Sequence, residues 1–232
     1  MKHLIVIPTF ILAIALTADT FVANADDELS LRQERAFQEL FDAFADGAGS
    51  ESLLHLRYAF DEKLITTVIN SLSIHDNTPM LGKTGPLLVE FSDYQCGYCK
   101  RMYSTLQEKI EAGRARVLVL EFPILGELSD TAARYALAAQ KQQKYVAFHD
   151  ALMRQHGAIT TNNLNKVATA VGLDLTQLQA DISSEEIDQE LKKNYRLALL
   201  LNIRATPSFV INNTIVRGAL QQEELQRLLE GQ

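Results

Sequence analysis

Two cysteines separated by two residues are the part of this sequence best suited to chemistry. Cys96 and Cys99 lie in the stretch FSDYQCGYCK (residues 91–100), and the 232-residue chain contains no other cysteine. A pair at this spacing is compatible with a redox-active dithiol, part of a metal site, a haem attachment or a structural disulfide. The surrounding residues must decide among these four.

The number of available ligands, the residue after the second cysteine and the short spacing weaken the zinc, haem and structural-disulfide alternatives. A structural zinc site needs four ligands, and His149 and His156, seven residues apart, do not have a usual ligand spacing, so we interpret both histidines as surface residues. Covalent haem needs a histidine directly after the second cysteine, where this chain has Lys100. A disulfide across two residues closes a loop too short to constrain the unfolded chain appreciably. Copper(I) binding by two thiolates stays open as an alternative to the dithiol.

The elements on either side of the pair favour the redox-active dithiol. Residues 87–91 (LLVEF) predict a buried strand and residues 101–112 a helix, so Cys96 should lie at a helix N-terminus. Unpaired N–H groups and the helix dipole stabilise a thiolate there, and Lys100 and Arg101 add positive charge. Cys96 would then be both nucleophile and leaving group. Cys99, one turn later and more buried, would attack the mixed disulfide and release the substrate.

The N-terminus predicts export. Lys2 gives a basic start, residues 4–18 are apolar, and Ala23-Asn24-Ala25 matches a signal-peptidase site. A membrane anchor is the alternative, but the apolar run is short for a bilayer and Asp19 ends it with a charge. We therefore expect residues 1–25 to be a cleaved signal peptide and the mature protein to be exported. The formal net charge of −7 offers no basic surface for nucleic acid.

Residues 26–75 predict a helical arm. A capping box at 30–33 precedes an apolar stripe of Phe37, Leu40, Phe41 and Phe44, and a second amphipathic helix is expected at about 52–72. Turn-forming residues at 76–86 predict a linker. Because two helices alone make a thin core, we expect the arm to pair with the same arm of another protomer, giving a dimer or trimer; packing against its own domain is the alternative.

From residue 87 to residue 232 the pattern alternates between strand and helix. A second strand is predicted at 117–122, helices at about 127–201 with breaks near Gly157, Gly172 and Ser183-Ser184, a hairpin around Asn212-Asn213, and a last helix at 221–229. The β-α-β order implies a parallel strand pair. The fold class is therefore α/β, a thioredoxin-like fold with a central helical insertion, preceded by an N-terminal α-helical arm.

With these motifs in place, residues 79–232 resemble the DsbA-type thiol–disulfide oxidoreductases of the bacterial envelope. The resemblance lies in VEFSDYQCGYCK (89–100), EFPILG (121–126) and ATPSFVIN (205–212). It implies a redox-active Cys96–Cys99 disulfide with no other cofactor. It also implies that Thr206-Pro207 is a cis-proline loop that faces the cysteines and binds the substrate strand, with Thr206 tuning activity. Glu90, six residues before Cys96, matches the buried acid of the family and would transfer protons; its apolar neighbours favour burial over an exposed strand end.

Two departures from the family's oxidising prototype suggest the direction of the reaction. Gly97-Tyr98 replaces the prototype's Pro-His, and a histidine there helps to stabilise the reduced form. The helical arm is absent from the monomeric prototype and resembles the oligomerisation segments of dimeric or trimeric relatives. We therefore expect an isomerase or dual oxidase-isomerase that acts on exported cysteine-containing proteins and is reset by a membrane redox partner. The alternatives are a plain dithiol oxidase, recharged by a membrane quinone-linked partner, and a non-enzymatic copper(I)-binding or redox-sensing protein.

Overall fold

The computed structural model describes residues 79–232. The predicted signal peptide (1–25), the helical arm (26–75) and the first residues of the linker lie outside the described residues, so those assignments stay predictions.

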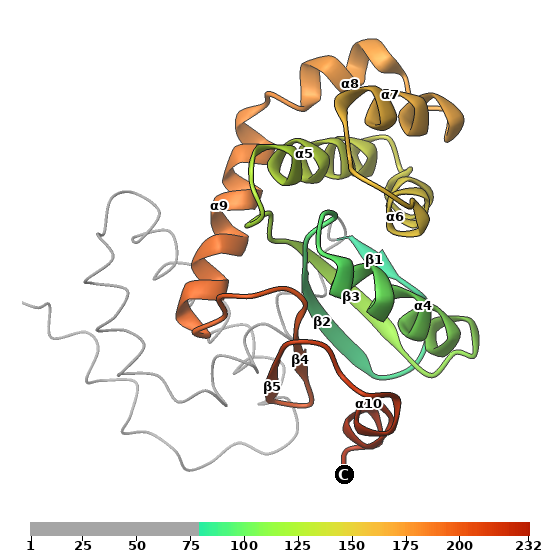
Figure 1. Cartoon of the computed structure of the whole chain (residues 1–232), viewed down its shortest axis with the longest axis vertical. Helices are drawn as coiled ribbons and strands as arrows, with labels where there is room; N and C mark the ends of the chain where they lie inside the picture. Colours follow the sequence, from blue (N-terminus) through green and yellow to red (C-terminus); the bar gives the residue numbers. More distant parts are fainter. Residues whose placement is uncertain (1–78) are drawn as a thin grey trace, which may run out of the picture.

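A five-stranded sheet in the order β1-β3-β2-β4-β5 organises the described chain (Figure 1). The strands are β1 (Met80–Leu81), β2 (Leu87–Ser92), β3 (Arg116–Glu121), β4 (Ser208–Ile211) and β5 (Thr214–Arg217). The helix α4 (Gly97–Glu111) joins β2 to β3, and these two strands are parallel, as the β-α-β pattern predicts. The other neighbouring pairs are antiparallel. The thioredoxin-like α/β fold is therefore confirmed.

The predicted linker contributes a strand to this sheet. Met80 and Leu81 pair with Leu118 and Val117 of β3, so the sheet begins before residue 87. The turn after β1 carries Gly85 at φ +96, and a Cβ there would lie 2.6 Å from the backbone nitrogen of Ala115. Only glycine fits this left-handed position against a neighbouring backbone.

The β4–β5 hairpin also forms as predicted. Asn212 and Asn213 both have positive φ, 46° and 66°, which is the backbone of a type I′ turn. The Asn212 side-chain amide donates to the carbonyl of Leu228 at 2.7 Å. That bond fastens the hairpin to the last helix, α10 (Gln222–Leu229).

Five helices form the insertion between β3 and β4. They are α5 (Glu127–Lys141), α6 (Tyr145–Arg154), α7 (Thr161–Ala170), α8 (Leu175–Asp181) and α9 (Glu185–Leu200). The predicted breaks are confirmed, and the side chains of Thr160, Asp174 and Ser184 cap the helices that begin after them. One break was not predicted: α5 ends and α6 begins around Gln143, which has a φ of 57°, inside a segment whose composition gave no turn signal.

The helices cover the two faces of the sheet unequally. On one face Leu88, Val117 and Val119 belong to the large apolar cluster that includes α4, α10 and α5–α8. On the other face Phe91 and Leu120 pack with residues of α9. Figure 1 shows α5–α8 gathered beyond one end of the sheet, with α9 running back toward the strands. Among the helices of residues 79–232, none is both long and apolar enough to cross a membrane.

Candidate active site

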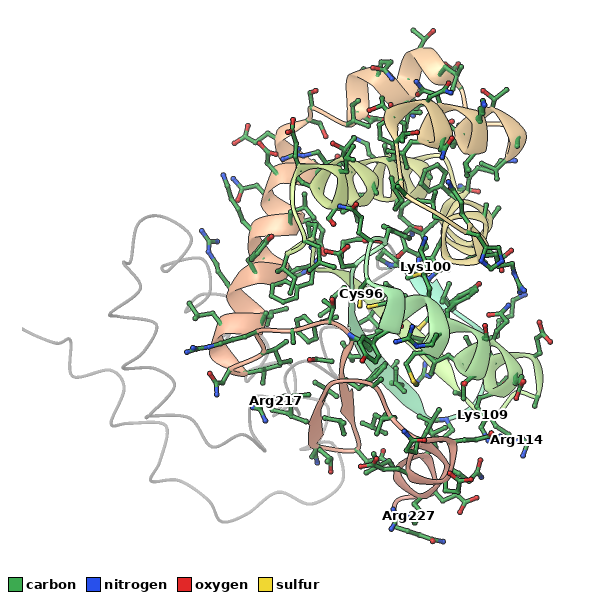
Figure 2. The ribbon with its side chains drawn as sticks, viewed as in Figure 1. Cys96, Lys100, Lys109, Arg114, Arg217 and Arg227 are labelled. Atoms are coloured by element: carbon green, nitrogen blue, oxygen red, sulfur yellow. The ribbon has the colours of Figure 1, made fainter. Side chains whose placement is uncertain are left out.

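Cys96 lies at the start of α4, directly after the loop that leaves β2. The helix begins at Gly97 rather than near residue 101, because Cys96 itself is the N-cap: its sulfur accepts the backbone N–H of Cys99 at 3.3 Å. The Cys96 thiol donates to the carbonyl oxygen of Thr206 at 3.2 Å. Figure 2 shows Cys96 and Lys100 where α4 faces the helical insertion.

The pKa of Cys96 is lowered from 9.0 to about 6. The largest cause is the hydrogen bond with the Cys99 thiol; the Thr206 side chain and the backbone N–H groups of Cys99 and Tyr98 add to it, while burial opposes it. Lys100 and Arg101, expected to supply charge, have other partners. The Lys100 ammonium donates to the carbonyl of Gln155 at 2.9 Å, and the Arg101 guanidinium lies 4.1 Å from the centroid of the Tyr98 ring.

Cys99 has the opposite character. Its side chain is 0% exposed, against 5% for Cys96, and both cysteines are free thiols in this structure. Burial raises the pKa of Cys99, and the bond that it makes with Cys96 and the charge of Glu90 raise it further. Near neutral pH the pair therefore combines one slightly exposed thiolate with one fully buried, protonated thiol, as expected for a nucleophile and its resolving partner.

Gly97 and Tyr98 form an open rim beside Cys96. Tyr98 is 60% exposed, and Gly97 is exposed with the Arg101 guanidinium 3.7 Å from the position of a Cβ. The two middle residues of the motif are thus available to an incoming polypeptide. Their predicted tuning role stays a prediction.

The Thr206-Pro207 loop faces the cysteines, as the resemblance implies. The peptide bond between these residues is cis, and the Thr206 carbonyl contacts the Cys96 thiol. The Pro207 carbonyl accepts the N–H of Gly218 at 2.9 Å, which ties the loop to the end of β5. The loop is therefore held next to the reactive sulfur; substrate binding by it stays a prediction.

Glu90 is buried beneath the site. It is 1% exposed, which excludes the exposed strand end, and its Oε1 accepts the Ser92 hydroxyl at 3.1 Å. Burial raises its pKa from 4.5 to about 8; the Ser92 bond lowers it, and the charge of Cys96 raises it further. A carboxyl that titrates near neutral pH next to two thiols can hold or release a proton during exchange.

Asp93, which was not among the residues predicted for the site, shapes the loop before Cys96. Its carboxylate accepts the N–H groups of Ile124 and Leu125 at 2.9 and 3.0 Å and the Ser129 hydroxyl at 2.8 Å. It also accepts the N–H of Gln95 at 2.8 Å, an aspartate turn of the kind that sequence alone can suggest. These bonds fasten the loop to the EFPILG segment.

A second group of buried polar side chains lies behind the loop. Tyr94 and Tyr145 both donate to Oε1 of Glu121, at 2.8 and 2.7 Å, and the Tyr94 oxygen lies 2.8 Å from Nδ1 of His149. His149 is fully buried, so its interpretation as a surface residue was wrong; His156 is exposed as expected. Glu121 could have been found by the rule used for Glu90, because it too comes after apolar strand residues.

No group of three or more histidine, cysteine, aspartate or glutamate side chains within residues 79–232 is arranged to hold a metal ion. Copper(I) binding by the two thiols alone stays a prediction.

Comparison with known proteins agrees with this geometry. The family model described as the DSBA-like thioredoxin domain matches residues 87–230, more than half of the chain. A crystal structure of a thioredoxin-like oxidoreductase from Silicibacter pomeroyi DSS-3 is 40% identical with a TM-score of 0.66, covering 70% of this chain and 95% of that one. A periplasmic thioredoxin-like protein from Salmonella enterica serovar Typhimurium is 26% identical with a TM-score of 0.63, covering 71% and 95%. The probable disulfide bond formation protein D of Bacillus anthracis is 26% identical over 162 residues, covering 63% of this chain and 75% of the relative.

Proposed function

Because the chain belongs to the DSBA-like thioredoxin-domain family and is a thiol–disulfide oxidoreductase of that type, we propose that it acts on the disulfides of exported proteins, as an isomerase or as a dual oxidase-isomerase. The Cys96–Cys99 couple carries the reaction with no further cofactor. The observation that supports this most directly is the arrangement of Cys96, a thiol with a pKa of about 6 that contacts the Thr206 carbonyl next to an open rim.

In the oxidising direction, a substrate thiolate attacks the Cys96 sulfur of the disulfide. The S–S bond breaks, a substrate–Cys96 bond forms, and Cys99 leaves as a thiolate that takes up a proton, because its burial raises its pKa. A second substrate thiolate then attacks the substrate sulfur of the mixed disulfide. The substrate leaves oxidised by two electrons, and Cys96 leaves as a stabilised thiolate.

In the isomerising direction the reduced enzyme begins the reaction. The Cys96 thiolate attacks a wrong disulfide in the substrate and forms the mixed disulfide, releasing one substrate thiolate. A different thiolate of the same substrate then attacks the substrate sulfur of the mixed disulfide. The new substrate disulfide forms, the bond to Cys96 breaks, and Cys96 leaves as a thiolate. Cys99 rescues trapped complexes by attacking Cys96, and a membrane redox partner restores the dithiol.

Export and assembly complete the proposal. The apolar segment at 4–18 and the Ala23-Asn24-Ala25 site support a periplasmic protein, as does the similarity to a periplasmic Salmonella protein. The amphipathic pattern of residues 26–75 supports a dimer or trimer in which several active sites reach one substrate. Gly97 and Tyr98, in place of a Pro-His pair, support the isomerase or dual role.

Reactivation of scrambled ribonuclease by the reduced protein tests this function. We expect reactivation by the native chain, none by Cys96→Ser, and accumulated mixed disulfides with Cys99→Ser. If the reduced protein fails to reactivate ribonuclease but still oxidises dithiols, it is a plain oxidase, an assignment that the stabilised Cys96 thiolate also supports. If it binds copper(I) stoichiometrically and shows no thiol–disulfide exchange, it is neither an isomerase nor an oxidase.

A further inference from the structure

Two buried glutamates occupy diagonal positions on neighbouring strands, on the sheet face that supports α4. Ser92 of β2 is the register partner of Glu121 of β3, and Glu90, two residues before Ser92, projects from the same face. Both glutamates are 1% exposed, and the Ser92 hydroxyl bonds to Glu90. None of the ion pairs formed within residues 79–232 includes either glutamate. Two uncompensated acids in one apolar region must influence each other's protonation.

Glu121 is also connected to the redox loop by direct contact. Its Oε1 accepts the hydroxyl of Tyr94, which lies two residues before Cys96, and the hydroxyl of Tyr145 from α6. Its Oε2 and the Nε2 of His149 have no hydrogen-bond partner among the described residues. A buried carboxyl oxygen without a donor favours the protonated acid.

Counting protons shows that the bonds joining Glu121 Oε1, the two tyrosine hydroxyls and His149 Nδ1 can be formed in two ways. When Glu121 is ionised, both tyrosines donate to Oε1, and His149 carries its proton on Nδ1 and donates it to the Tyr94 oxygen. When Glu121 is protonated on Oε1, it donates to the Tyr94 oxygen, Tyr94 donates to Nδ1, and the histidine proton is on Nε2. The two forms differ by one proton and by the direction of the Tyr94 hydrogen bonds, with no side chain displaced.

Among residues 79–232, no positively charged side chain forms an ion pair with Glu121. Burial raises its pKa from 4.5 to about 8; the tyrosine bonds lower it, and the charges of Asp93 and Glu90 raise it. Burial lowers the pKa of His149 to about 3, so the imidazole is neutral. From α9, Asn194 donates to the Glu121 backbone carbonyl at 3.1 Å.

The charged groups beyond His149 are paired with each other. Asp150 of α6 forms an ion pair with Arg154 at 2.6 Å and accepts the hydroxyl of Tyr103 of α4 at 2.8 Å. The ring of Tyr103 packs edge-on against His149. The aromatic ring thus separates this surface pair from the buried cluster.

We propose that Glu121 is a second buried acid of the redox site, a positioning residue that binds its proton more tightly when Cys96–Cys99 is reduced than when it is a disulfide. This inference rests on the proposed function. Reduction transfers two electrons from a dithiol to the disulfide, places one proton on Cys99 and leaves a negative charge on Cys96. That negative charge lies at the end of the loop that carries Tyr94, and it raises the proton affinity of each of the two buried acids directly, so the two acids together take up part of a further proton from solvent.

Carbon-13 NMR of the glutamate carboxyl carbons in the full chain, titrated in both redox states, tests this. We expect two resonances with midpoints near pH 8, one lost in Glu90→Gln and the other in Glu121→Gln. Reduction should raise the Glu121 midpoint by about half a unit or more, which is about a threefold gain in proton affinity. Glu108→Gln, an exposed change on α4, should leave both midpoints unchanged.

Tyr94→Phe and Tyr145→Phe provide an independent test in which both Glu90 and Glu121 are still present. Each removes a donor to the carboxylate, so each should raise the Glu121 midpoint. A Glu121 midpoint in the ordinary range for glutamate, or one equal in both redox states, overturns the inference even if disulfide exchange is normal. If the Glu121 midpoint depends on the redox state but the protein shows no disulfide-exchange activity, the proton coupling is supported and the proposed function is contradicted.

Discussion

Cys96 and Cys99 are the same residue type one helical turn apart, and folding moves their pKa values in opposite directions. The difference arises because Cys96 receives hydrogen bonds at a helix N-terminus, whereas Cys99 is buried and donates one. Since the folded pKa of Cys96 lies below its unfolded value, the thiolate contributes stability above about pH 9 that is lost as the pH falls through about 6. This group alone therefore makes the folded dithiol protein more stable as the pH rises from about 6 to about 9, whereas the raised pKa values of Cys99 and Glu90 act in the opposite direction.

The first prediction concerns the source of that low pKa. Cys99→Ala should raise the pKa of Cys96 by about one unit or more, because the Cys99 thiol is the largest single cause of the lowering. Thiolate absorbance in the ultraviolet, recorded against pH, measures it. Lys100→Gln should shift the midpoint less, since that ammonium binds the Gln155 carbonyl. A Cys99→Ala midpoint that stays near 6 would assign the lowering to Thr206 and the backbone N–H groups instead.

The second prediction concerns Glu90. Its pKa in the folded protein is raised to about 8. The protonated side chain therefore does not destabilise the fold below about pH 4.5, and the buried carboxylate lowers the free energy of unfolding as the pH rises through 8. Glu90→Gln, which can still accept the Ser92 hydroxyl, should leave stability nearly unchanged at about pH 4. At about pH 9 it should stabilise the dithiol form by on the order of 2–4 kcal/mol. Thermal unfolding across this range measures the difference, with Glu108→Gln as the control; equal effects at both ends would exclude a buried titrating acid.

At the scale of residues, the local sequence indicates which side chains are buried but not which side chains they contact. The apolar neighbours Val89 and Phe91 indicate that Glu90 is buried, and Leu120 and Phe122 indicate the same for Glu121. Nothing near His149 indicates that it meets Tyr94, which lies 55 positions earlier in the chain. Its burial results from the docking of α6 on the redox loop, and for that reason the surface interpretation failed.

At the scale of elements, the boundaries that sequence misses are those with unusual caps. The strands at 87–91 and 117–122 are predicted to within one residue at each end, because continuous apolar runs are a strong signal. The start of α4 is missed because a cysteine caps it. The end of α5 is missed because Gln143, with a left-handed backbone, occupies a position where glycine is usual.

That position gives the third prediction. The N–H of Lys144 bonds to the Ala139 carbonyl and that of Gln143 to the Gln140 carbonyl, the two bonds of a Schellman motif with Gln143 at its left-handed position. Gln143→Gly should stabilise the protein by about 0.5–1 kcal/mol, because glycine adopts this backbone without strain. Urea unfolding measures it. Gln189→Gly, at an exposed position within α9, should destabilise by about 1 kcal/mol; the same sign for both would contradict the assignment.

At the scale of the whole molecule, the redox site is assembled from segments distant in sequence. Glu90 comes from the sheet, and the two cysteines come from the start of α4. The cis-proline comes from the loop before β4, and Tyr145 and His149 come from the helical insertion. The order of elements sufficed to predict the fold, because β-α-β and β-β-α units have few ways to share a sheet. It could not predict how the insertion docks, because docking depends on side-chain contacts between α6 and the loop after β2.

The fourth prediction separates chemistry from assembly. Every residue placed at the site lies within residues 79–232, whereas isomerisation is expected to need several sites facing one substrate. Deleting residues 26–72 should therefore yield a monomer by light scattering that still oxidises dithiols but no longer reactivates scrambled ribonuclease. Replacing Phe37, Phe41 and Phe44 with serine in the full chain should do the same if that apolar stripe makes the contact. A native chain that is already monomeric would contradict assembly through the arm, and a deletion variant that still isomerises would show that isomerisation does not need the arm.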